Sequence, residues 1–169
     1  MDKHMKWLLI ALSVLLVLFG INQFQQSERS SDSDQVFDIE RDEVFNIHVS
    51  NGTESISLFF NGESWSIDGN DTLIVKENTV DSFFSKVLNV KKTTLVSKNK
   101  SKWDKFNVGD STGIQLVLND HNGKLLGQIA VGRSGAEWSV SNIRIGDEIE
   151  VYQTNENISY QLNTSPTYW

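Results

Sequence analysis

The chain has 169 residues, of which 38% are hydrophobic, a formal net charge of -7 and no cysteine. The lack of cysteine excludes disulfides and a lipid-modified N-terminal cysteine, and the acidic balance argues against a nucleic acid partner. A chain of this length has room for one ordinary hydrophobic core and a short additional segment.

The N-terminal segment combines a basic start with an apolar run. Lys3 and Lys6 precede the run from Trp7 to Ile21, and the stretch from Met5 to Phe24 counts twenty residues. About 20 residues are enough for a helix to cross the hydrocarbon core of a bilayer. A cleaved signal peptide fits the same pattern, but small residues at the spacing that cleavage requires lie inside the run or well beyond it. We therefore expect an uncleaved membrane anchor.

The charges around the apolar run predict its orientation. Lysines lie before it and acidic residues follow it, which places the N-terminus in the cytoplasm. We expect a single-pass protein of the cell membrane that contacts the lipid bilayer through Trp7 to Ile21. Everything after about Ser27 is expected to be extracytoplasmic, or periplasmic if the source has two membranes.

Composition divides the rest of the chain in two. Residues 28–43 hold seven acidic and two basic side chains, and the polar stretch from Gln25 to Asp34 has no apolar side chains to bury, as in a flexible spacer. We therefore expect a cytoplasmic N-terminus and anchor in residues 1–27, an acidic spacer in residues 28–43 and an extracytoplasmic α+β domain in residues 44–169.

The first part of this domain predicts a three-stranded meander. Apolar side chains fall at alternate positions of the first strand, which is typical of a half-buried strand. Two Asn-Gly pairs predict tight hairpin turns. The three strands are expected at Val44 to Ser50, Glu54 to Phe60 and Ser64 to Ile67.

The next segment changes its period and predicts one amphipathic helix from Glu77 to Val90. Its apolar residues follow the i, i+3, i+4, i+7, i+8 spacing of one helical face: Val80, Phe83, Phe84, Val87 and Leu88. Such a stripe is more typical of core packing than of an open binding groove. We expect the helix to pack across the sheet.

The remainder predicts short strands separated by turns, with one helical turn over Ser101 to Phe106. The strands are expected at Thr93 to Ser97, Ile114 to Leu118, Leu125 to Val131, Trp138 to Ile145 and Glu148 to Gln153. The predicted fold class is α+β: a mainly antiparallel β-sheet with one amphipathic helix packed on it, preceded by a single N-terminal transmembrane helix.

Several short motifs follow one another along the chain, and their order is informative. They are Trp65-Ser66-Ile67, Leu95 to Asn99, Phe106-Asn107-Val108, Leu125 to Gly132, Glu150-Val151-Tyr152 and Leu162 to Trp169. This order resembles the bacterial membrane-associated family catalogued as domain of unknown function 4340, across roughly Val36 to Trp169. The chain departs from the family at Asp68 to Asp71, where members usually have proline. The resemblance implies an extracytoplasmic domain associated with ABC-type transport or gliding-related systems, and it supplies no catalytic residues.

Catalytic chemistry is not indicated by any motif. His4, His48 and His121 lack the spacing of a zinc site. The Asp and Asn clusters at residues 32–38 and 68–71 lack the glycine and glutamate positions of a calcium loop. The stretch Gly132 to Gly135 reads as a tight loop without the following helix of a nucleotide-binding motif. We expect that the chain is not an enzyme and binds no cofactor or metal. A hydrolase with dispersed carboxylates stays open, because two catalytic carboxylates can be distant in the sequence and close in space.

A cluster of lysines is the main candidate for an interaction patch. It consists of Lys91, Lys92, Lys98, Lys100, Lys102 and Lys105, together with Trp103, and only Asp104 opposes it. A solvated loop would also explain the cluster. The functional alternative is docking to anionic lipid headgroups, to an acidic partner or to the acidic spacer itself.

We interpret the chain as a non-enzymatic interaction module with a protein partner in the membrane or envelope; through the resemblance, it would be accessory to an ABC-type transport or envelope system. No small-molecule ligand is indicated. The alternative is a module that binds polysaccharide or peptidoglycan through tryptophan stacking. Trp65 and Trp138 are expected in the core, whereas Trp103 is equally suited to the core or to the surface.

Overall fold

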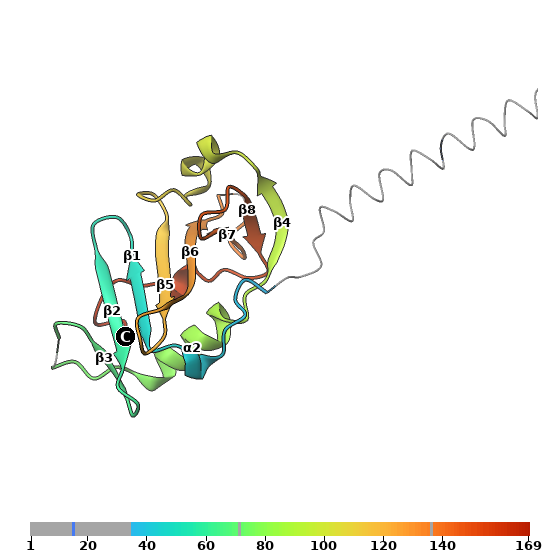
Figure 1. The fold of residues 1–169 in the computed structure, drawn as a ribbon. Helices are drawn as coiled ribbons and strands as arrows, with labels where there is room; N and C mark the ends of the chain where they lie inside the picture. Colours follow the sequence, from blue (N-terminus) through green and yellow to red (C-terminus); the bar gives the residue numbers. More distant parts are fainter. Residues whose placement is uncertain (1–14, 16–34, 71, 136) are drawn as a thin grey trace, which may run out of the picture.

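The computed structural model describes Leu15 and residues 35–70, 72–135 and 137–169 (Figure 1). The expected anchor, apart from Leu15, and the expected spacer up to residue 34 lie outside these residues. In the described part of the chain, no helix is long and apolar enough to cross a membrane.

Eight antiparallel strands form one sheet in the order β3-β2-β1-β5-β6-β7-β8-β4. The strands are β1 Asn46–Ser50, β2 Ser55–Phe60, β3 Trp65–Ile67, β4 Lys92–Ser97, β5 Ile114–Asn119, β6 Leu125–Arg133, β7 Ser141–Ile145 and β8 Val151–Thr154. The α-helix is α2 Glu77–Val87, and short 3-10 turns are η1 Arg41–Glu43, η2 Lys100–Lys102, η3 Asp104–Phe106 and η4 Ser159–Gln161. The predicted mainly antiparallel α+β fold is confirmed for the described residues.

The predicted meander is present as β1, β2 and β3. Gly52 and Gly62, in the two Asn-Gly turns, have φ of +82° and +98°, which side chains with a Cβ rarely adopt. The opposite side of β1 pairs with β5, and Asn46 faces Asn119 there. Local turn chemistry therefore explains one pairing of β1, and a contact between distant segments provides the other.

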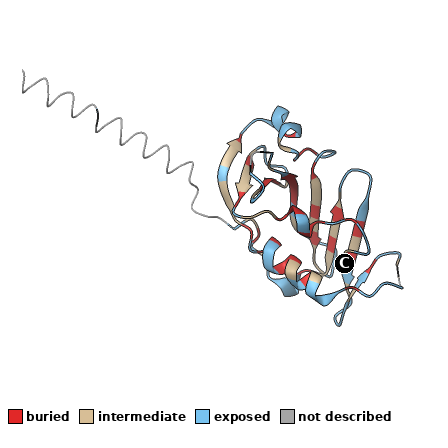
Figure 2. Ribbon diagram, turned by 180° about the vertical axis from the view of Figure 1, so that it is seen from behind, coloured by how far each residue is buried: buried red, intermediate tan, exposed pale blue. Residues whose placement is uncertain are grey.

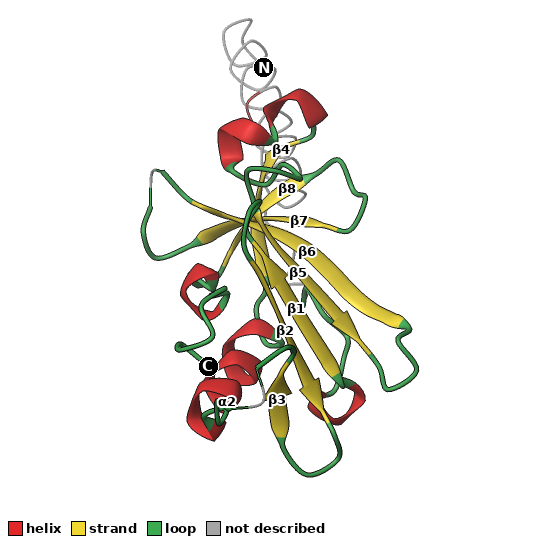
Figure 3. Ribbon diagram, turned by 90° about the vertical axis from the view of Figure 1, so that its left-hand side faces the viewer, coloured by secondary structure: helices red, strands yellow, loops and turns green. Residues whose placement is uncertain are grey.

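Helix α2 crosses one face of the sheet because it connects strands at opposite edges. The chain leaves β3 at one edge, passes through α2 and enters β4 at the other edge, where β4 pairs with β8. Figure 3 shows α2 on one side of the twisted sheet. The helix ends at Val87 rather than at the expected Val90.

The main core lies between α2 and the sheet (Figure 2). Four residues of the predicted helical stripe are buried within α2, and the fifth, Leu88, is buried as its C-cap. They pack with the inward side chains of the central strands, including Ile47, Val49, Leu116, Leu118 and Ile129. The apolar stripe of the helix and the alternating apolar residues of the strands therefore meet in one layer. Full burial of each such side chain contributes about 1.5–3 kcal/mol.

The residues before β1 form part of the folded domain. We call residues 35–43 the strap. Phe37 is only 5% exposed and belongs to the main core, and the Val36 amide donates to the Val90 carbonyl. A Cβ on Gly127 would lie 2.8 Å from the Phe37 ring, so the strap lies directly against β6. The expected boundary at residue 44 is therefore too late, because ordered packing is already present from residue 35.

The opposite face of the sheet carries a second, smaller core over β6 and β8. It consists of Trp103, Val108, Ala130 and Val151, with Val96 and Phe106 packed against it. Residues 98–110 cover this part of the sheet and place η2 and η3 beside β4 (Figure 3). The single helical turn expected at Ser101 to Phe106 is thus two 3-10 turns.

Candidate functional site

Residues 98–106, which we call the lysine lobe, hold four of the six lysines of the predicted patch. Asn99 caps the start of η2, and its side-chain oxygen accepts a hydrogen bond from the Ser101 amide at 2.9 Å. Asn107 caps the end of η3 with a left-handed φ of 55°, a conformation that asparagine tolerates better than most residues. These two asparagines explain why the segment forms short turns instead of a continuous helix.

Trp103 fixes the lysine lobe to the sheet. Its side chain is 7% exposed, and its indole Nε1 donates to the Ile149 carbonyl at 3.0 Å. The guanidinium of Arg144 stacks on the ring at 4.0 Å from the centroid. Trp103 is therefore a buried support and is not available to stack a sugar, which removes the residue on which the glycan alternative depended.

Arg144 is the buried cation beneath the lobe. Its side chain is 5% exposed, whereas its partner Asp110 is 84% exposed. The Arg144 Nε donates to the Val108 carbonyl at 3.0 Å, and Nη2 donates to the Asp110 carboxylate at 2.6 Å. Each hydrogen bond to a charged group contributes about 1.5–3 kcal/mol. Arg144 thus ties β7 to the segment that follows the lobe.

Gly132 allows the lobe backbone to approach β6. A Cβ at this position would lie 2.2 Å from the Phe106 carbonyl oxygen. The interpretation of Gly132 to Gly135 as a tight loop was wrong at its start, because Gly132 and Arg133 are the last residues of β6. The glycine serves close packing of backbone on backbone.

The positive charge of the lysine lobe is not neutralised locally. Among the described residues, no ion pair involves its four lysines, all of which are exposed: Lys98, Lys100, Lys102 and Lys105. Within the lobe only Asp104 opposes the four lysines, and its carboxylate accepts from the Thr112 hydroxyl at 3.1 Å, while Asp110 pairs with Arg144. The lobe is a compact cationic surface.

The structure divides the predicted patch at β4. Lys91 and Lys92 lie at the start of this strand and are half-buried, and the Lys92 ammonium lies 5.3 Å from the Tyr152 ring centroid. The lysine lobe follows the other end of the strand. Five steps along β4 separate the two groups by about 17 Å. The six lysines therefore share one edge of the molecule but do not form one cluster.

Trp65 and Trp138 behave differently from each other. Trp65 is half-buried and packs against the main core, as expected. Trp138 is 83% exposed, so its expected burial was wrong. The predicted strand from Trp138 begins only at Ser141, and Trp138 lies in the turn that precedes it.

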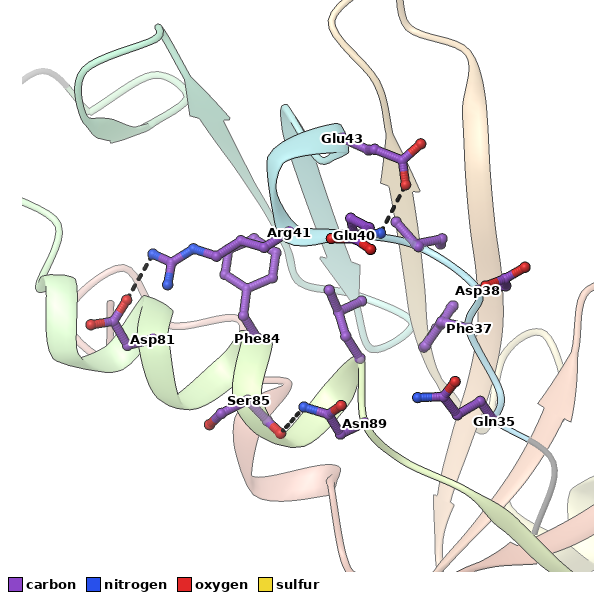
Figure 4. A pocket seen from close by; sticks show the side chains of 12 residues that line it. Gln35, Phe37, Asp38, Glu40, Arg41, Glu43, Asp81, Phe84, Ser85 and Asn89 are labelled. Carbon is purple, nitrogen blue, oxygen red and sulfur yellow. Dashed lines mark hydrogen bonds and ion pairs between the residues drawn. The ribbon is translucent and has the colours of Figure 1, made fainter.

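A groove that the sequence did not reveal runs along α2. It consists of three adjoining hollows of about 560, 520 and 370 Å³ between α2, the strap and the segment around β3, and Arg41 lines all three. Figure 4 shows the first hollow, with the strap on one side and α2 on the other. We call this surface the α2 groove.

Arg41 divides the α2 groove. Its guanidinium lies 5.0 Å from the Phe84 ring centroid and 2.7 Å from the Asp81 carboxylate (Figure 4). Both side chains of this ion pair are about half exposed, so the pair can be displaced by a ligand at little cost. Arg41 and Asp81 line both of the first two hollows and lie where these hollows meet.

Aromatic rings form the floor of the groove. Phe60 lies 5.4 Å from Trp65, and Trp65 lies 5.7 Å from Phe84, measured between ring centroids. The series continues inward through Phe83 to Trp169 at 5.4 and 5.6 Å. The floor is thus continuous with the main core, and its rings are held in place.

The rim of the groove is acidic and partly apolar. Its seven carboxylates are Asp38, Glu40, Asp42, Glu43, Glu63, Glu77 and Asp81, against the single basic residue Arg41. Ile74 also lines the groove and is 92% exposed. An aromatic floor with this rim suits a ligand that combines apolar and basic groups.

The family comparison covers the larger part of this architecture. A family model described as Domain of unknown function (DUF4340) matches residues 65–169. The chain belongs to this family. No curated protein and no solved structure matches the chain.

In this DUF4340 chain, the match begins at β3 and includes α2 and the lysine lobe. The strap, β1 and β2 precede it. The α2 groove is therefore built from both parts of the chain, since Arg41 comes from the strap and Trp65 and Asp81 come from the matched segment. The apolar residues Val36, Phe37 and Ile39 were the signal in the acidic stretch that could have revealed the strap.

Proposed function

We propose that this DUF4340 chain is a membrane-anchored, extracytoplasmic interaction module that binds a protein partner in the α2 groove. The apolar run from Trp7 to Ile21 and the charges around it support the anchor and its orientation. The family resemblance supports a role as an accessory of an ABC-type transport or envelope system. The groove supplies the binding surface.

The aromatic floor beneath an exposed apolar rim is the observation that carries this proposal. Aromatic side chains that are already held in place lose little freedom on binding and often dominate the energy of interfaces. Ile74 exposes nearly its whole side chain beside this floor, and exposed apolar surface next to a hollow is typical of interaction sites. The seven rim carboxylates select for a basic, apolar segment of the partner.

Site-specific photo-crosslinking tests the proposal in native membranes. A photoreactive phenylalanine analogue in place of Ile74 should form one discrete protein adduct, whereas the same analogue in place of Asp147, in the exposed turn between β7 and β8, should not. The double substitution Glu63→Lys with Glu77→Lys should reduce the Ile74 adduct at least tenfold. The matched control, Asp147→Lys with Glu148→Lys, makes the same charge change away from the groove.

Two results would contradict the proposed partner site. One is an adduct of equal yield at Ile74 and at Asp147, which would indicate random collision. The other is an Ile74 adduct that decreases equally in both charge variants, which would indicate a dependence on net charge instead of on the groove.

A further inference from the structure

We propose that the lysine lobe is a second docking surface, one that binds the anionic phospholipid headgroups of the membrane that anchors the chain. This inference rests on the proposed anchor and goes beyond the proposed partner site. It assigns a ligand to the surface at the β4 edge, which is separate from the α2 groove.

Charge is the first argument. Four exposed lysines lie within eight residues, and no ion pair to another described residue neutralises any of them. The two carboxylates of this region are engaged by Thr112 and Arg144. Near an anionic membrane surface, the attraction of each lysine to the headgroups raises the affinity about fivefold, or roughly 0.7 log unit.

Rigidity is the second argument. Trp103 and Arg144 hold the lobe against the sheet through the contacts at 3.0 and 4.0 Å described above. Gly132 lets its backbone rest directly on β6. A cationic surface that is already fixed loses little conformational freedom when it docks. The lobe is therefore better suited to a membrane surface than an equally charged flexible loop would be.

Position is the third argument. Gln35, the first residue of the strap, forms a bridge with Lys91 immediately before β4, and the lysine lobe follows β4 at its other end. The turns η2 and η3 of the lobe lie beside β4 (Figure 3), so the bridge and the lobe lie at opposite ends of this edge strand. The thirteen residues between Ile21 and Gln35 can span at most about 45 Å. The apolar run thus keeps Gln35 within that reach of the headgroups, and the lobe lies about 17 Å farther along β4.

The opposite end of the molecule supports the same orientation. Helix α2 and β3, which border the α2 groove and its carboxylates, lie away from the turns of the lysine lobe (Figure 1), and the groove extends from them to Gln35. An anionic bilayer repels the groove and attracts the lobe. Free nucleic acid is a poor alternative occupant because the chain as a whole has a net charge of -7.

Energy transfer from the protein to the membrane tests the inference with the full chain. Because the chain has no cysteine, Thr94→Cys on β4 and Ser64→Cys between β2 and β3 each provide one labelling site for a donor dye. The labelled chains are reconstituted into vesicles that carry an acceptor lipid. The vesicles are made of phosphatidylcholine alone or with about 30 mol% phosphatidylglycerol as the anionic probe. Flotation of the vesicles measures anchoring independently.

We expect energy transfer from Thr94→Cys, but not from Ser64→Cys, to increase when phosphatidylglycerol is present and to fall back at high salt. Lys98→Gln with Lys102→Gln should lower the ratio of docked to free lobe by about 30-fold. The matched pair Lys86→Gln with Lys124→Gln, on α2 and in the turn before β6, should leave the ratio unchanged.

The two proposals fail in different ways. If the chain floats with the vesicles but transfer from Thr94→Cys is independent of phosphatidylglycerol, or both lysine pairs have the same effect, lipid docking by the lobe is overturned and the anchor stands. If the chain does not float even with phosphatidylcholine vesicles, the anchor is overturned, and lipid docking that rests on it falls as well.

Discussion

Arg144 shows how one buried charge can organise a surface some distance from it. Its side chain is almost completely buried, yet it contacts Trp103 within the lysine lobe and Val108 and Asp110 in the segment between the lobe and β5. A planar guanidinium can stack on Trp103 and donate several hydrogen bonds at once, which an ammonium group cannot do. The position of the exposed lysines therefore depends on Arg144, a buried cation beneath them.

Replacement of Arg144 should be strongly destabilising. Arg144→Met leaves the Val108 carbonyl without its donor and removes the stacking on Trp103, so we expect the free energy of unfolding to fall by about 2–4 kcal/mol. Urea denaturation followed by tryptophan fluorescence measures this change. Arg133→Met, at an exposed residue on β6, is the control and should change the free energy by less than about 0.5 kcal/mol. Equal effects of the two substitutions would show that Arg144 has no special role.

Tyr168 predicts a loss of stability at high pH. Burial raises its pKa above the ordinary value of 10.0, so the folded state holds the phenolic proton more tightly than the unfolded state does. This contribution is fully present below pH 10 and is lost as the pH rises through the raised pKa. Tyr168→Phe should therefore flatten the decline in stability above pH 10. Chemical denaturation at pH 8 and at pH 11 provides the measurement, with Tyr160→Phe as the exposed control.

The tryptophans illustrate the limit of residue-scale prediction. Trp138 follows an alternating pattern that favours burial but lies in a turn, whereas Trp103 is in 3-10 turns that have no period to reveal a buried face. Arg144 lies on the face of β7 that points away from the main core. The sequence around it does not show that residues 98–110 cover this face. These side chains are buried by segments distant in the sequence.

At the scale of elements, hydrophobic periodicity predicted most of the fold. The α2 stripe, the meander and the later strands were found within a few residues of their expected positions. The strap and the α2 groove were not predicted, because a high density of charge in residues 28–43 concealed the apolar side chains of the strap. The charge of residues 28–43 predicted a spacer. Val36, Phe37 and Ile39 nevertheless pack the second half of this segment, the strap, against the main core.

Truncation provides a test of the strap. Deletion of residues 1–34 should leave the free energy of unfolding of the domain unchanged. Deletion of residues 1–43 removes Phe37 from the core and should lower it by about 3–5 kcal/mol. Thermal and urea denaturation of the two fragments give the comparison. Equal stability of both fragments would contradict the role of the strap and would restore the boundary at residue 44.

At the scale of the whole molecule, the charges are separated. The lysine lobe lies at the β4 edge, and helix α2, which borders the acidic groove, lies away from it (Figure 1). Net charge, the only charge quantity that composition gives, conceals this separation. The order of the strands was equally inaccessible from sequence, because the placement of β4 beside β8 depends on α2 crossing the sheet.

Accessibility to a membrane-impermeant maleimide tests the orientation of the whole chain. Since the natural chain lacks cysteine, Ser111→Cys should be labelled in intact cells or spheroplasts, whereas Asp2→Cys should be labelled only after the membrane is permeabilised. The charge bias around the apolar run is the physical reason. Labelling of Asp2→Cys in intact cells together with protection of Ser111→Cys would reverse the proposed topology.

The pairing of β4 with β8 also has a consequence for synthesis. A chain that emerges from its N-terminus exposes Leu95 long before Tyr152, its partner in the finished sheet, has been made. More than fifty further residues must be synthesised before β4 and the turns that follow it can pack against β8. Assembly of this edge of the domain therefore comes late, because it depends on a contact between segments distant in the sequence.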